Sequence, residues 1–261
     1  MARALLPIVL VLLAAGIRET RVAVLVALVA GTLVAVHRGA SVRWAWAAPV
    51  PVALSLAFGL IPPPIADPSG LDCTSIASPP ALWRLLEAIL VLGVLGLLAI
   101  ILRAPADSLW LRRPSLWAAG LGVAGFGLFA VLGLALGPSL ARPFFGAITL
   151  DTSRPLALVP ALVFALANGV MEETAYRGAL LSWSARVIGL APALVLQAIV
   201  FGLAHGGPDV IAGSLPPAAG LALGGVLAGV VAIRTRSLIV PIAIHVALDL
   251  PLYVYLACRT G

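Results

Sequence analysis

Four ionisable side chains in the last third of the chain have the types and spacing to do chemistry. Glu172 lies in the apolar segment Leu156–Ser184, His205 ends the next apolar segment, and His245 and Asp249 lie in the last one. Placing one such group in a membrane helix costs roughly 2.5–3.5 kcal/mol on insertion scales, so chains that keep several usually use them. Carboxylates and imidazoles are general acids and bases. The set therefore predicts catalysis by proton transfer.

Helical geometry gives the two adjacent glutamates different roles. Glu173 and Arg177 are four residues apart, so they share a helix face and can form an ion pair. Glu172 is rotated by about 100° from its neighbour and faces Asn168 and Tyr176 instead. A desolvated carboxylate in that position can serve as a general base. The alternative is that both glutamates belong to one buried ionic cluster.

The histidines have structural interpretations as well as catalytic ones. A single histidine at a helix end, such as His205, is often only a hydrogen-bonding group. His245 and Asp249 are four residues apart and share a helix face. Either they bond to each other or both face a common third group. The alternative interpretation is a polar pair that joins two helices.

The depth of these residues along their helices favours a common site. With a turn near Ile188, Glu172 lies sixteen residues before it and His205 seventeen after it. In two antiparallel helices these positions have nearly the same height. A third helix that starts on the same side after Arg236 brings Asp249 within roughly 6 Å of that height, at about 1.5 Å per residue. The sequence therefore predicts one site around a water molecule.

The composition predicts that lipid surrounds these helices. Of 261 residues, 62% are hydrophobic and 10% charged, and the mean hydropathy is +1.16, whereas soluble domains carry roughly 25% charged residues. We expect an all-α, polytopic transmembrane bundle of eight or nine helices. The sixteen basic residues are arginines scattered between apolar runs, which argues against nucleic acid as a partner.

A spanning helix needs about 20 apolar residues. Residues 4–36 could form two short helices broken at Arg18–Arg21, or one long tilted helix. Gly220 with Gly224, and Gly225 with Gly229, have the GxxxG spacing of closely packed membrane helices. The other candidate spans are Trp46–Ile61, Leu82–Leu102, Leu116–Gly137, Leu156–Ser184, Ala191–His205, Ala218–Ile233 and Leu238–Ala257.

The arginines predict the orientation of the bundle. We define side X as the side with Arg38, Arg43, Arg103, Arg112, Arg113, Arg186, Arg234 and Arg236, and side Y as the side with Arg84, Arg142, Arg154 and Arg259. Eight arginines against four favour side X as cytoplasmic. Cys73 and Cys258 both fall on side Y, where a disulfide is permitted. The composition, without lysine, suggests the cytoplasmic (inner) membrane of a bacterium.

Three ordered motifs carry a family resemblance. They are EExxxR at 172–177, FxxxH at 201–205 and HxxxD at 245–249. The set resembles the CPBP family of CAAX-prenyl-protease and bacteriocin-processing intramembrane proteases, often called glutamic-type. The likeness covers roughly residues 155–257. It divides the chain into N-terminal transmembrane helices without a recognisable motif, 1–137, and catalytic helices, 138–261.

The resemblance implies a role for each motif residue. Glu172 would activate water with the help of His205, and His245 with Asp249 would stabilise the oxyanion or orient the water. The best-studied members have Asn where this chain has Asp249. An ionised Asp cannot donate to an oxyanion, so Asp249 would be protonated, orient His245 or bind a cation.

The same resemblance makes Glu173 and Arg177 a supporting pair and predicts catalysis without a cofactor. The alternative is a divalent metal such as zinc. Glu172, His205 and His245 form the His₂Glu set that catalytic zinc uses.

The predicted depth also bears on the substrate. Glu172 is fourteen residues from Arg186, or about 21 Å at 1.5 Å per residue, in a hydrocarbon core about 30 Å thick. The site is therefore expected nearer side Y, which suits membrane-anchored protein or peptide substrates with a C-terminal hydrophobic anchor, as in myxosortase-like members. Two other interpretations stay open: a transporter or channel, and a catalytically inactive immunity-type scaffold.

Overall fold

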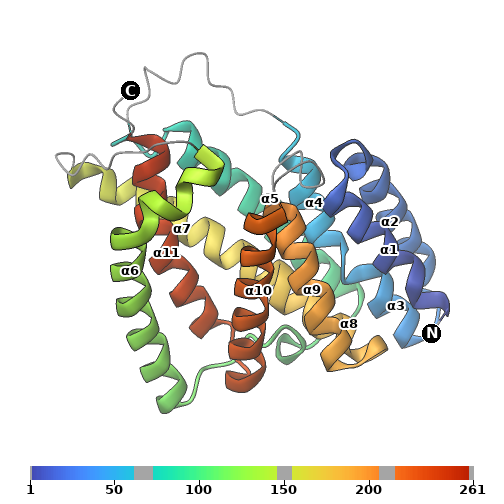
Figure 1. Cartoon of the computed structure of the whole chain (residues 1–261). Helices are drawn as coiled ribbons and strands as arrows, with labels where there is room; N and C mark the ends of the chain where they lie inside the picture. Colours follow the sequence, from blue (N-terminus) through green and yellow to red (C-terminus); the bar gives the residue numbers. More distant parts are fainter. Residues whose placement is uncertain (1, 62–72, 146–154, 206–214, 259–261) are drawn as a thin grey trace. The chain divides into compact units, whose positions relative to one another are not determined.

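The computed structural model describes residues 2–61, 73–145, 155–205 and 215–258 (Figure 1). Within these ranges the chain forms α-helices α1 to α11, short 3-10 turns and one π-helix, and no strand. The predicted all-α class is confirmed. If α3 with α4, and α7 with α8, are each counted as one helix, eleven helices become nine, the upper of the two predicted numbers.

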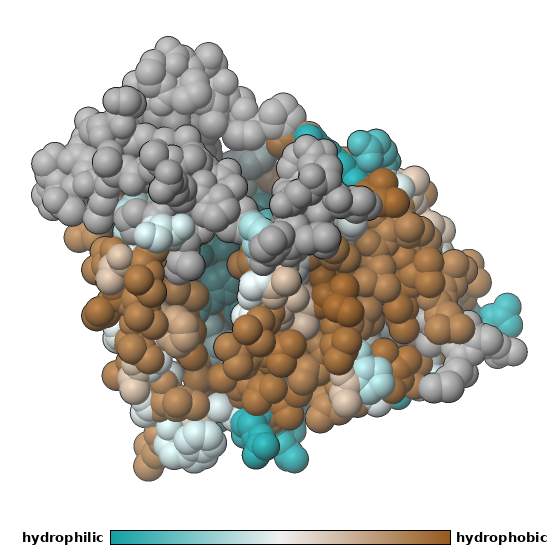
Figure 2. Space-filling view, viewed as in Figure 1, coloured by the Kyte–Doolittle hydropathy of each residue, from teal (hydrophilic) through white to brown (hydrophobic). Residues whose placement is uncertain are grey.

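The described helices have the length and surface of a membrane protein. Four are long and apolar enough to cross a bilayer: Pro80–Ile101, Leu116–Gly137, Leu158–Ile188 and Pro217–Thr235. Large apolar side chains cover their outer faces, and Figure 2 shows hydrophobic residues over most of the visible helical surface. Soluble proteins rarely expose contiguous apolar patches of this extent. The chain is a multi-pass membrane protein.

Contacts between helices divide the chain into two compact units. Unit 1 contains residues 1–61, 90–113 and 172–238, and unit 2 contains residues 62–89, 114–171 and 239–261. The chain passes from one unit to the other inside α5 (Pro79–Ile101) and at the last residue of α7 (Leu158–Glu172).

The N-terminal part of unit 1 resolves two open questions about helix boundaries. Residues 4–36 form two helices, α1 (Ala2–Gly16) and α2 (Arg21–Ala35), separated by a 3-10 turn. The expected single span Trp46–Ile61 is wrong, since α3 (Ala40–Ala47) ends before Pro49 and α4 (Val50–Phe58) follows it. Proline lacks the N–H for a helical hydrogen bond, so Pro49 donates none at this break. The residue before it, Ala48, keeps helical dihedral angles (φ −52°, ψ −45°).

The motif-bearing segment after α7 is not a regular α-helix. A π-helix, η5 (Glu173–Leu181), follows α7 and continues into α8 (Ser182–Ile188). All nine residues of η5 are buried. The predicted span Leu156–Ser184 is confirmed as one uninterrupted helix, Leu158–Ile188, but its middle has π turns, which a periodicity of 3.6 residues per turn does not predict. Single π turns within α-helices frequently occur at functional sites.

Unit 1 continues through an antiparallel helix pair. Gly189, with a φ of +88°, ends α8 and allows the chain to turn into α9 (Leu190–His205), close to the predicted turn. Helix α10 (Leu215–Thr235) packs on α9, where a Cβ on Gly225 would lie 3.1 Å from the Cα of Ala198. The expected close packing is therefore present at Gly225, whereas a Cβ on Gly220 would meet no described atom within 4 Å.

In unit 1, segments that the arginines assign to side X are joined by hydrogen bonds. The backbone N–H of Leu238 donates to the carbonyl of Trp110 (3.1 Å), and the Ser237 hydroxyl donates to the carbonyl of Arg112 (2.9 Å). The indole of Trp183 donates to the Ser108 hydroxyl (3.2 Å). The connection 102–115, the turn after α10 and helix α8 therefore lie at one end of the unit, as the arginine pattern predicts.

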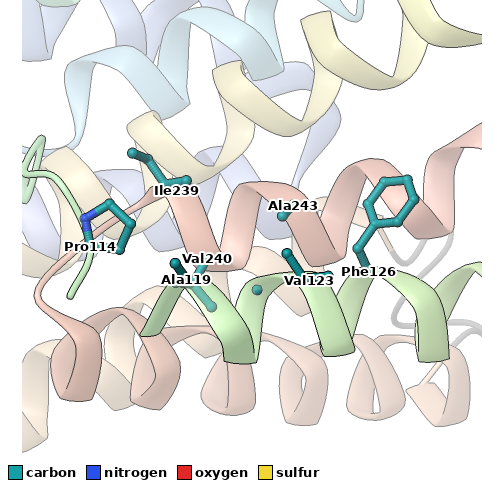
Figure 3. Close-up of a pocket in the computed structure, with 8 residues that line it drawn as sticks. Pro114, Ala119, Val123, Phe126, Ile239, Val240 and Ala243 are labelled. Atoms are coloured by element: carbon teal, nitrogen blue, oxygen red, sulfur yellow. The ribbon is translucent and has the colours of Figure 1, made fainter. Parts of the chain in front are cut away.

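Unit 2 is built on a close pair of helices, α6 (Leu116–Phe145) and α11 (Ile239–Ala257). Glycines of α6 face α11: a Cβ on Gly125 would lie 2.8 Å from Ile244, and one on Gly133 would lie 2.8 Å from Pro251. Small residues let membrane helices approach closely. An apolar groove of about 360 Å³ lies along the pair (Figure 3) and is lined by Pro114, Ala119, Gly122, Val123, Phe126, Ile239, Val240 and Ala243.

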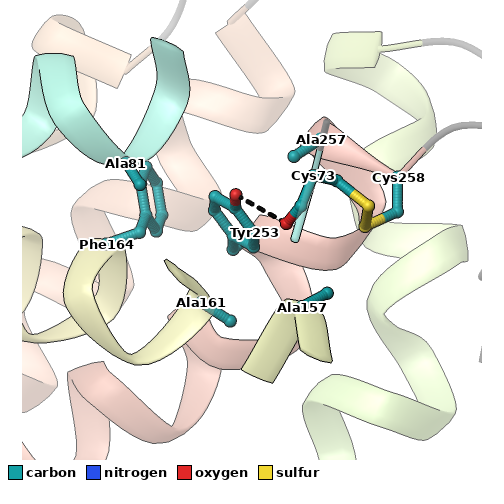
Figure 4. Close-up of a cluster of buried hydrophobic side chains, with 8 residues drawn as sticks. All are labelled: Cys73, Ala81, Ala157, Ala161, Phe164, Tyr253, Ala257 and Cys258. Carbon is teal, nitrogen blue, oxygen red and sulfur yellow. Dashed lines mark hydrogen bonds between the residues drawn. A yellow bond between two sulfur atoms is a disulfide. The ribbon is translucent and has the colours of Figure 1, made fainter. Parts of the chain in front are cut away.

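A disulfide lies at the end of unit 2 where α11 finishes. Cys73 and Cys258 are bonded, with Cα atoms 5.3 Å apart, which answers a question that the sequence leaves open. Beside them the Tyr253 hydroxyl donates to the carbonyl of Cys73 (3.1 Å) and lies 2.5 Å from the Ser78 hydroxyl. Figure 4 shows this buried cluster around Tyr253 and Phe164. The start of α5 and the end of α11 therefore share one end, which is side Y.

Candidate active site

Glu172 and His205 lie against each other in unit 1. Glu172 is the last residue of α7 and His205 the last residue of α9. His205 Nε2 is 3.4 Å from Glu172 Oε2, and the side chains are 32% and 7% exposed, respectively. His205 Nδ1 lies 2.8 Å from the carbonyl of Phe201. A carbonyl only accepts hydrogen bonds, so Nδ1 carries the proton and Nε2 faces the carboxylate.

The neighbouring glutamate has the different environment that helical geometry predicts. Glu173 Oε1 accepts a hydrogen bond of 2.9 Å from Arg177, and both side chains are at most 2% exposed. The Arg177 guanidinium lies over the Phe201 ring, 4.5 Å from its centroid. Phe201 in turn contacts the His205 ring (centroids 4.3 Å apart) and the edge of Tyr176. The ion pair thus supports the ring that packs against His205.

A second polar group lies in unit 2. Asn168 Nδ2 donates to Asp249 Oδ2 (2.7 Å) and is 3.4 Å from His245 Nε2. His245 Nε2 is 3.5 Å from the same Asp249 oxygen. Asn168 and Asp249 are 6% and 4% exposed. Both arrangements open for His245 and Asp249 are present: the two side chains lie 3.5 Å from each other, and both also contact Asn168.

Asn168 is absent from the predicted site residues. Its signal in the sequence is a polar side chain within apolar residues, four positions before Glu172. That spacing by itself indicates only which way Glu172 faces. The missing information is the register between α7 and α11, because it decides which α7 side chain meets Asp249.

The structure thus brings the predicted residues together as two groups, each within its own unit. Glu172 and His205 form one, and His245 with Asp249 forms the other, joined by Asn168. That all four predicted residues act on one water stays a prediction. Within either unit, the described residues contain no group of three or more His, Cys, Asp or Glu that could hold a metal ion. Whether the site binds a metal ion is not tested by this.

The fold and these groups define a polytopic membrane protein with buried acid–base residues, and comparison with known proteins names its class. Residues 154–251 match the family model Rce1-like, described as type II CAAX prenyl endopeptidase Rce1-like. The matched segment, a little over a third of the chain, is that of a CPBP family intramembrane protease, which indicates a peptidase. No curated protein and no solved structure was found to match it. All the motif residues from Glu172 to Asp249 fall inside the matched segment.

Proposed function

We propose that the chain is an intramembrane endopeptidase that cuts near the C-terminal end of membrane-anchored proteins, with Glu172 as the general base. The observation that carries this proposal is the contact between the buried carboxylate of Glu172 and the partly exposed imidazole of His205, inside the segment that matches the peptidase family. A general base must lie within hydrogen-bonding reach of the water it activates. The pair offers two acceptor atoms, 3.4 Å apart, for one water.

The tautomer of His205 supports this use of the pair. Because Nδ1 donates to the carbonyl of Phe201, Nε2 of the neutral ring has a lone pair and accepts. A water between the two residues would donate one O–H to Glu172 and the other to His205. Its oxygen lone pairs would then point away from both acceptors, towards a substrate carbonyl.

The reaction proceeds by proton transfer through Glu172. Glu172 removes a proton from the water as its oxygen bonds to the carbonyl carbon, which gives a tetrahedral oxyanion. The carboxylic acid then returns that proton to the departing amine as the C–N bond breaks. We assign His245 to stabilising the oxyanion and Asp249 to orienting His245. One support is that His245 Nε2 lies 3.5 Å from Asp249 Oδ2. Another is the count of residues along the helices, which predicts similar depths in the membrane for Asp249 and Glu172.

The proposed substrates carry a C-terminal hydrophobic anchor and are cut near side Y, outside the cytoplasm of a bacterial cell. Two observations support that face. Side X has the larger number of arginines, and Cys73 and Cys258 form a disulfide on side Y. Disulfides persist in oxidising compartments.

Two synthetic probes test the proposal with purified protein in liposomes. The first is a fluorescence-quenched peptide followed by about 20 apolar residues, and the second is the same peptide with a farnesylated C-a-a-X end. We expect cleavage of the anchored peptide in preference to the farnesylated one. Preferential cleavage of the farnesylated probe would reject the anchored substrate class, and cleavage of neither would reject the proposed function.

Glu172→Gln tests the base itself. It keeps the shape of the side chain and removes the group that accepts the proton, so we expect the rate to fall by about 10²–10⁴-fold. Glu173→Gln is the matched control, with a smaller loss of rate in the protein that remains folded. Undiminished cleavage by Glu172→Gln would exclude Glu172 as the base. Loss of activity on exhaustive chelation, restored by zinc, would favour the metal alternative.

A further inference from the structure

The side-chain amide of Asn168 is held in one orientation. Its Nδ2 donates to Asp249 Oδ2 at 2.7 Å. In the role assigned above, in which Asp249 orients His245, its carboxylate is ionised and has only acceptors, so the amide nitrogen, and not the amide oxygen, faces Asp249. The close approach of α11 limits movement, because a Cβ on the next residue, Gly169, would lie 3.1 Å from Val246.

This orientation leaves the carbonyl oxygen of the same amide with a hydrogen bond to make. Asn168 Oδ1 is buried and has no hydrogen-bond partner among the residues that the structure describes. A buried acceptor without a donor is unfavourable, and native proteins satisfy nearly all of them with protein, water or ligand. The site therefore calls for a donor that the described side chains do not supply.

The position of Asn168 on α7 suggests what that donor is. Asn168 and Glu172 are four residues apart on one helix, or about 6 Å at 1.5 Å per residue. Two residues of an extended peptide span roughly the same distance, at 3.2–3.4 Å each. A substrate that lies extended along α7, with its scissile carbonyl at Glu172, would have a backbone N–H near Asn168.

We infer that Asn168 is a substrate-binding residue: its Oδ1 accepts a hydrogen bond from a substrate backbone N–H about two residues from the scissile bond. Asp249 acts as the positioning residue that keeps the amide turned towards the substrate. The inference rests on the proposed function and deepens it, because backbone recognition lets the enzyme read an extended segment irrespective of its side chains. It also gives Asp249 a role that does not require donation to the oxyanion.

An ester scan of the anchored peptide tests this contact. Each backbone N–H within three residues of the scissile bond is replaced in turn by an ester oxygen, which cannot donate. In wild type we expect one ester, about two residues from the cut, to lower kcat/KM by about tenfold, the effect of one hydrogen bond. In Asn168→Ala, which has already lost the acceptor, the same ester should have no more effect than its neighbours.

Controls separate this role from a structural one. Ser78→Ala removes a different buried hydrogen bond of unit 2, to Tyr253, and should leave the ester sensitivity unchanged. Asn168→Gln keeps both amide groups but places them one methylene farther out, so it should also lose sensitivity at that position. It provides the test if Asn168→Ala does not fold.

The outcomes distinguish the two proposals. If wild type cuts the all-amide peptide but no ester position is sensitive, the inference fails and the proposed function stands. Equal sensitivity in wild type and Asn168→Ala would likewise overturn the inference. If wild type does not cut the peptide at all, the proposed function itself fails.

Discussion

At the scale of single residues, the adjacent glutamates of the EExxxR motif have different neighbours. Glu172 contacts an imidazole whose side chain is 32% exposed, whereas Glu173 is paired with an arginine that is 1% exposed. Replacing a buried ion pair can be harmless, but removing one partner leaves the other charge buried. The two carboxylates should therefore differ in what their loss costs.

We predict that Glu173→Gln destabilises the protein far more than Glu172→Gln does. It leaves the Arg177 guanidinium without its carboxylate, at a cost of about 3–5 kcal/mol. Thermal unfolding in detergent, followed by the fluorescence of buried tryptophan, measures the difference. Glu172→Gln serves as the matched control, one residue away with the same change of charge. Equal unfolding temperatures for the two variants would contradict the assignment of Glu173 as the structural partner.

At the scale of elements, α9 and α10 meet at a contact that leaves no room for a side chain. A Cβ on Gly202 would lie 2.4 Å from the backbone carbonyl of Ala218, whereas one on Gly220 would meet no described atom within 4 Å. Gly202 is three residues before His205 in the same helix. Its contact therefore sets the distance of α10 from the end of α9 that carries the histidine.

Gly202→Ala should lower both stability and cleavage. The added methyl group cannot fit against a backbone atom, so the helices must move apart, at about 1–3 kcal/mol for overpacking. Gly220→Ala adds the same group where the described structure has space, and should change stability by no more than about 0.5 kcal/mol. Unfolding and cleavage rates of the two variants provide the comparison. Indistinguishable variants would show that this helix contact does not position His205.

At the scale of the whole molecule, the chain is tied to itself across 185 residues by the Cys73–Cys258 bond. A disulfide stabilises mainly by restricting the unfolded chain, typically by 2–4 kcal/mol. The bond also reports sidedness, because it joins two side Y segments and needs an oxidising compartment. Variants of these two cysteines therefore test both the stability of the fold and the side of the membrane on which the bond lies.

Cys73→Ser and Cys258→Ser should each lose about 2–4 kcal/mol, and the double variant should lose no more than either single one, because all three lack the same bond. In wild type, maleimide should label the denatured protein only after reduction. Reporter fusions should place the Arg234–Arg236 turn in the cytoplasm and the Cys258 end outside it. Additive losses, thiols that react without a reductant or the opposite topology would contradict this arrangement.

The sequence by itself determined that lipid surrounds the helices and that the protein is all-α. It also determined which connections lie at the same end of the helices and that Glu173 pairs with Arg177. These follow from composition and from spacing along one helix, which are local properties. The count from Ile188 also predicted equal heights for Glu172 and His205, because two helices joined by a short turn have little freedom in register.

Only the tertiary structure decided what depends on contacts between distant segments. The π-helix after Glu172 forms within a fully buried segment, whose packing the 3.6-residue periodicity does not encode. The disulfide requires two residues far apart in sequence to meet. The partner of His245 and Asp249 depends on the register of α11 against α7, and it is the amide of Asn168. No spacing along a single helix specifies that register, since it is set by side chains of both helices packing together.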